Sequence, residues 1–65
     1  MKFHVPEMSC GHCTAAITKE ISAIDPSAKV ATDLDLRTVD VDSVQTDGAV
    51  AQAIKTAGYA SELLA

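Results

Sequence analysis

Aromatic side chains are nearly absent from this sequence, which has no tryptophan, one phenylalanine and one tyrosine. Hydrophobic residues make up 48% of the 65 residues, but eleven of them are alanine. A domain of this size buries only about 60% of the surface that its unfolded chain exposes. We therefore predict one thin-cored domain spanning residues 1–65, without a deep pocket for an organic substrate.

Basic residues and long apolar runs are also scarce. Four lysines and one arginine are scattered along a chain whose net charge is −4. Because binding a phosphate backbone needs clustered basic residues, nucleic acid is excluded as a partner. No apolar run approaches the ~20 residues needed to cross a bilayer, which argues against membrane insertion. Residues 1–7 lack the apolar stretch of a secretory signal, so we expect a cytoplasmic protein if Met1 is its natural start.

The apolar pattern predicts an α+β domain with the element order β-α-β-β-α-β. Alternating apolar residues indicate strands, and apolar residues spaced three or four apart indicate helices. The strands are expected at 3–5, 30–34, 39–41 and 60–64, and the helices at 13–24 and 47–57. Ile17, Ile21 and Ile24 should face the core, and residues 35–37 should form a hairpin turn. This order predicts a ferredoxin-like sandwich: one four-stranded antiparallel sheet with both helices on one face.

The chemically informative residues lie in the segment MSCGHC, residues 8–13, between the first strand and the first helix. Its two cysteines, Cys10 and Cys13, should be reduced thiols in the cytoplasm. A helix N-terminus presents backbone N–H groups and a partial positive charge, which favours thiolate over thiol. Two thiolates this close can hold one metal ion together.

The number of available ligands favours Cu(I) as that ion. Cu(I) is soft and prefers sulfur, whereas a structural zinc site normally needs four ligands. Only His12, His4 and Glu7 are near enough in sequence to supplement the two cysteines. Such an open site suits transfer, because an incoming thiolate can bind before an old one leaves.

The motif resembles the MxCxxC signature of heavy-metal-associated domains, and the segment IKTAGY, residues 54–59, resembles the end of that family's second helix. Together the two segments extend the resemblance over essentially the whole chain. Within the family, the sequence is similar to bacterial copper chaperones of the CopZ type. The resemblance implies Cu(I) held by Cys10 and Cys13, a buried Met8 that anchors the loop, and Tyr59 close to the metal. The sequence departs from the family pattern at Glu7, where glycine is usual.

The resemblance also implies partners and an oligomeric state. The expected partner is a CxxC domain of a copper-transporting P-type ATPase or a copper-responsive regulator. The protein should be monomeric without metal, with a copper-bridged dimer as an alternative when metal is bound. Apart from the resemblance, five aspartates are expected at the surface, where they could steer a basic partner toward the site: Asp33, Asp35, Asp40, Asp42 and Asp47. No catalytic turnover is expected.

Several alternatives stay open. His12 is a candidate third ligand, a proton-sensitive gate for metal release, or an exposed loop histidine. Met8 is core filler or a weak thioether ligand, and Tyr59 packs, covers the metal, or does both. A zinc or other divalent-metal carrier, with Glu7 as a ligand, is the first alternative function. A CGHC thiol–disulfide oxidoreductase is the second, and a module that dimerises through a shared metal is the third.

Overall fold

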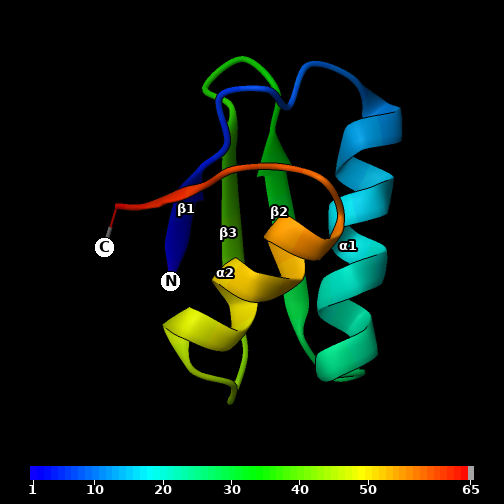
Figure 1. Cartoon of the computed structure of the whole chain (residues 1–65), viewed down its shortest axis with the longest axis vertical. Helices are drawn as coiled ribbons and strands as arrows, with labels where there is room; N and C mark the ends of the chain where they lie inside the picture. The colour runs from blue at the N-terminus through cyan, green and yellow to red at the C-terminus, as the bar shows by residue number, and fades with distance from the viewer. Residues whose placement is uncertain (65) are drawn as a thin grey trace.

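The computed structural model describes residues 1–64, which form four strands and two helices in the predicted order. The strands are β1 (Lys2–His4), β2 (Lys29–Asp33), β3 (Thr38–Asp42) and β4 (Glu62–Leu63), and the helices are α1 (Gly11–Ile24) and α2 (Asp47–Thr56). The strands make one antiparallel sheet in the order β2-β3-β1-β4. Both helices cover one face of this sheet and pack against each other (Figure 1). The predicted ferredoxin-like fold is confirmed.

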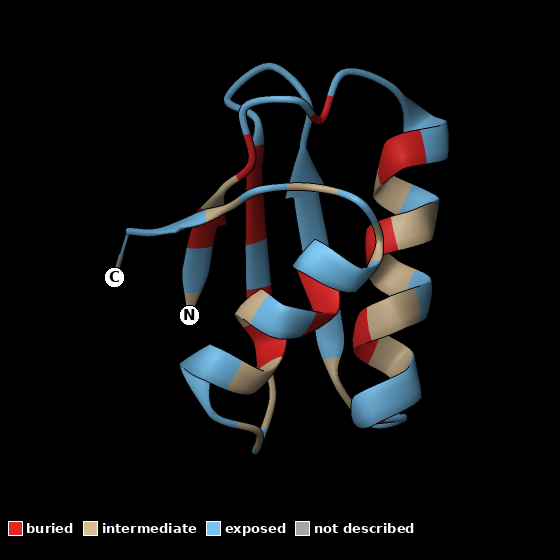
Figure 2. Ribbon diagram, in the orientation of Figure 1, coloured by how far each residue is buried: buried red, intermediate tan, exposed pale blue. Residues whose placement is uncertain are grey.

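The core lies between the sheet and the two helices. Helix α1 buries Ile17 and Ile21, which are four residues apart and therefore on one face. Phe3 and Val39, opposite each other in the β1–β3 register, are also buried. Figure 2 shows buried residues along β1 and β3 and on the side of α1 toward α2, whereas β2 has none. The full core comprises Phe3, Val5, Met8, Cys13, Ile17, Ile21, Val39, Val41, Val50, Ala53 and Ile54.

One predicted strand end and one predicted core position are wrong. Leu34 is 40% exposed because β2 ends at Asp33, whose carboxylate accepts hydrogen bonds from the backbone N–H groups of Asp35 and Leu36. This turn takes Leu34 out of the alternating strand pattern. Ile24 is 37% exposed because it is the last residue of α1, where the chain leaves the helix.

The remaining differences concern element ends. The last strand is Glu62–Leu63 instead of residues 60–64, and α1 begins at Gly11 instead of Cys13. Helix α2 ends at Thr56, one residue earlier than predicted. Its start is capped by Thr46, whose Oγ1 accepts a hydrogen bond from Ala49 N–H at 3.1 Å. Among residues 1–64, no helix is long and apolar enough to cross a membrane.

Candidate metal centre

The loop from β1 to α1 is anchored at two fully buried residues, Val5 and Met8. The backbone N–H of Met8 donates to the Val5 carbonyl at 3.0 Å, which closes a four-residue turn with Pro6 in its second position. Proline fixes φ at the value that this position requires. The predicted role of Met8 as a buried loop residue is therefore supported by its position in the core.

The two cysteines lie at the start of α1. Cys10 is the N-cap residue and is exposed, whereas Cys13 is the third residue of the helix and is buried. Their sulfur atoms are 3.4 Å apart. The Cys13 N–H donates to the Cys10 carbonyl at 3.1 Å, so the start of the helix brings the backbones of the two residues together. One thiol is thus fixed in the core and its partner faces outward.

Local hydrogen bonds favour the thiolate form of Cys13. The hydroxyl of Tyr59 has the largest effect, followed by the backbone of Ser9 and the thiol of Cys10, and together they lower the pKa of Cys13 to about 6 against the opposing effect of burial. Hydrogen bonding to Cys13 in turn raises the pKa of Tyr59. At neutral pH, Cys13 is therefore mainly the thiolate that binds soft metals.

The end of α2 positions Tyr59. Gly58 has φ of 101°, a conformation that glycine adopts without steric cost. The Gly58 N–H donates to the Lys55 carbonyl at 2.9 Å and the Tyr59 N–H to the Ile54 carbonyl at 3.2 Å, which together form a Schellman motif. The half-buried Tyr59 packs against the core, and its hydroxyl has the largest effect on the pKa of Cys13.

The other candidate ligands are not brought together with the cysteines. Among the described residues, no three His, Cys, Asp or Glu side chains form a group able to hold a metal ion. His12 is exposed on the first turn of α1, and Glu7 is exposed in the loop. His4 lies on β1 opposite Glu62, in the open sheet. The site is therefore an open pair of sulfur atoms.

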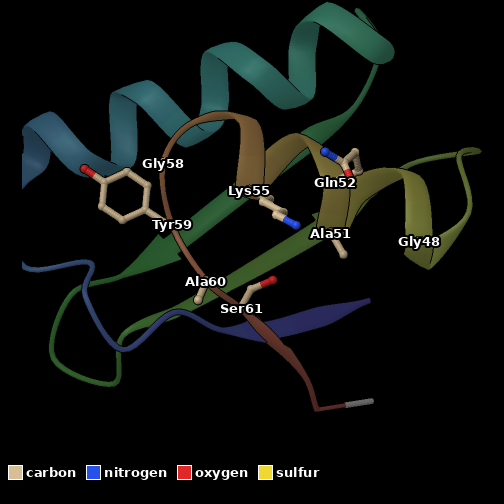
Figure 3. A pocket seen from close by; sticks show the side chains of 8 residues that line it. All are labelled: Gly48, Ala51, Gln52, Lys55, Gly58, Tyr59, Ala60 and Ser61. Atoms are coloured by element: carbon tan, nitrogen blue, oxygen red, sulfur yellow. The ribbon is translucent and has the colours of Figure 1, made fainter.

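A pocket of about 650 Å³ lies between α2 and residues 58–61 (Figure 3). It is lined by Gly48, Ala51, Gln52, Lys55, Gly58, Tyr59, Ala60 and Ser61. Only Tyr59 belongs to both this pocket and the metal centre, and neither cysteine lines it.

One residue next to the site was not found by sequence reasoning. Arg37, in the connection between β2 and β3, donates from Nη1 to the Pro6 carbonyl oxygen at the start of the loop. The two residues are 31 positions apart, and an isolated arginine in a predicted turn carries no signal of such a contact.

Comparison with known proteins identifies the family of the chain. The family described as "Heavy-metal-associated domain" matches residues 2–60. The chain belongs to the heavy-metal-associated domain family. Comparison with curated proteins gives no significant match.

Several solved structures are close in shape to the chain. The copper chaperone Atx1 from Synechocystis PCC6803, in its Cu2 form, is 31% identical, with a TM-score of 0.93 over 95% of this chain and 98% of that chain. Atu1203 from Agrobacterium tumefaciens is 40% identical, with a TM-score of 0.85 over 92% and 94%. A gold-binding protein is 36% identical, with a TM-score of 0.89 over 94% of both chains.

Proposed function

We propose that this heavy-metal-associated domain is a cytoplasmic Cu(I) chaperone that binds one ion through Cys10 and Cys13. The observation that carries the proposal is the pair of sulfur atoms 3.4 Å apart, with no third His, Asp or Glu gathered beside them in residues 1–64. Two thiolates suit a soft monovalent ion and leave zinc short of its usual four ligands. The similarity to the copper chaperone Atx1 supports the same assignment.

Two thiolates and one Cu(I) would form a complex with one net negative charge at the N-terminus of α1. The partial positive charge of the helix end stabilises that anion. Because the pKa of Cys13 is lowered to about 6, this thiol is mainly deprotonated at pH 7 before the ion binds. Its burial in the core would make Cys13 the better retained ligand.

Transfer would proceed by ligand exchange through the exposed side of the pair. A thiolate of the partner binds the ion first and makes a three-coordinate intermediate, after which one of the original thiolates leaves. Cys10 is exposed, whereas Cys13 is buried and interacts with Tyr59, so Cys10 would be released first. The partner would be a CxxC domain of a copper-transporting P-type ATPase or a copper-responsive regulator.

The burial of Cys13 argues against the oxidoreductase alternative. An enzyme that attacks a substrate disulfide needs an exposed thiolate of low pKa. Here Cys13, whose pKa is lowered, is buried. We therefore propose carriage of metal without catalytic turnover.

An anaerobic titration of the reduced protein with Cu(I), competed against a chelator of known affinity, tests the proposal. We expect saturation near one Cu(I) per chain, with Zn(II) unable to compete. Cys10→Ser and Cys13→Ser should each abolish tight binding, while Ser9→Ala, next to the pair, should not. If both serine variants held copper as tightly as the parent, the proposed site would be wrong. Gel filtration of the same samples reports whether copper converts the monomer to a bridged dimer.

A further inference from the structure

Arg37 has a backbone conformation that is unusual for its type. Its φ of 55° is the only positive value at a non-glycine residue in the described part of the chain. Side chains with a Cβ atom are disfavoured in this region, and turns normally place glycine or asparagine there. An arginine at this position therefore needs a compensating interaction, and its side chain and backbone both make one.

Both interactions reach the beginning of the metal-binding loop. Nη1 of Arg37 donates to the Pro6 carbonyl, and the Arg37 carbonyl accepts a hydrogen bond from the Val5 N–H at 2.8 Å. Figure 1 shows the β2–β3 connection beside this loop, at the same end of the sheet. The following bond, from Met8 N–H to the Val5 carbonyl, closes the turn. The first half of the loop is thus held by a hairpin from elsewhere in the sequence.

We propose that Arg37 is a positioning residue for the metal centre. By fixing Val5 and Pro6, it restricts the loop that carries the exposed Cys10 and so keeps this sulfur near Cys13. Cys10 has no packing of its own to hold it, because it and Ser9 are both exposed. When the bond between Cys10 and the ion breaks, an anchored loop allows that bond to re-form quickly, which slows the loss of copper. This inference rests on the proposed binding of Cu(I) by the two cysteines.

The substitution Arg37→Gly separates this role from a contribution to folding. Glycine relieves the positive φ, so a purely structural effect of the backbone would leave thermal stability unchanged or raise it. Loss of the guanidinium should instead speed the transfer of Cu(I) to a chelator by roughly tenfold. This is the lower end of the effects seen for residues that orient metal ligands, and we choose it because Arg37 is exposed. Arg37→Lys retains a charge and one donor group and should recover part of the loss.

Two measurements make the test decisive. Stopped-flow transfer of Cu(I) to a chelator is compared between the parent, Arg37→Gly, Arg37→Lys and Lys29→Ala. The Lys29 control removes one positive charge at the start of β2, at the opposite end of the sheet, and should transfer copper at the parent rate. Amide hydrogen exchange of Val5 in the metal-free proteins should be faster only in Arg37→Gly.

Three outcomes would contradict the inference in different ways. If the parent binds Cu(I) and Arg37→Gly releases it at the same rate, the positioning role is wrong and the proposed function stands. If Lys29→Ala accelerates release as much as Arg37→Gly, the effect is one of net charge and the positioning role is again wrong. If the parent binds no Cu(I), the proposed function is wrong and this inference fails with it.

Discussion

Replacing Met8 tests whether this residue packs the loop or binds the metal. Its side chain is fully buried and lies in the core cluster with Cys13. Removing a buried methionine side chain costs about 2–5 kcal/mol of stability. A domain of 65 residues has a total unfolding free energy of roughly 3–10 kcal/mol. Met8→Ala should therefore leave the protein close to unfolding, whatever its metal chemistry.

Met8→Leu is the informative variant, because leucine conserves most of the volume but has no sulfur. Such substitutions usually cost less than about 1.5 kcal/mol. In urea, with an m-value of about 1 kcal/mol/M, Met8→Ala should lower the unfolding midpoint by about 2 M or more, and Met8→Leu by clearly less. If Met8 only packs, the Met8→Leu variant should bind Cu(I) as tightly as the parent in the chelator competition.

A loss of copper affinity in a stable Met8→Leu protein would refute this reasoning. A tenfold loss corresponds to about 1.4 kcal/mol of binding free energy. If it occurred while the urea midpoint stayed within the expected range, the thioether would have to contribute to the ion directly. A matched control is Ile17→Leu, a similar exchange of volume at another fully buried position. It should change stability slightly and copper affinity not at all.

Two further predictions concern pKa values. Tyr59→Phe removes the hydroxyl that contributes most to lowering the pKa of Cys13, so the pH midpoint for alkylation of Cys13, followed by peptide mass spectrometry, should move up from about 6; an unchanged midpoint would contradict this. The pKa of Asp25 is lowered in the folded protein, chiefly by the Ser43 hydroxyl and then by Ser27. Its carboxylate therefore stabilises the fold at pH values above the ordinary aspartate pKa of about 3.9. That stabilisation is lost as the pH falls through the lower pKa of the folded state. Asp25→Asn should therefore melt at a lower temperature than the parent at pH 7, and the difference should shrink on acidification below pH 4; a constant difference would show that the charge is irrelevant.

Local patterns account for what could be predicted of the fold and the site. The i, i+4 spacing of Ile17 and Ile21 marks the buried face of α1, and alternation around Val39 marks β3. The cysteine motif is contiguous, so its place at the start of a helix follows from the neighbouring pattern. Glycine is common just after helices, and Gly58 follows the last residue of α2, Thr56, by two positions.

Long-range contacts account for what could not be predicted. Asp25 accepts hydrogen bonds from the hydroxyl groups of Ser27, at 2.8 Å, and Ser43, at 2.6 Å. Ser27 lies in the local turn that an aspartate before proline indicates, but Ser43 is 18 positions away. The contact of Arg37 with Pro6 likewise depends on how the hairpin and the loop meet in space. Neither contact follows from the local spacing of apolar residues in the sequence.

As the proposed ligands of the ion, the two cysteines lie in different parts of the domain, Cys13 in its core and Cys10 on its surface. Cys13 belongs to the hydrophobic core and to α1, so its position is maintained by the same packing that maintains the fold. Cys10 is held only by the helix start and by a loop fixed at Val5 and Met8. A carrier has to keep its ion against water and yet yield it to a partner thiolate. One buried and one exposed sulfur atom meet both requirements, since the exposed ligand can exchange without disturbing the core.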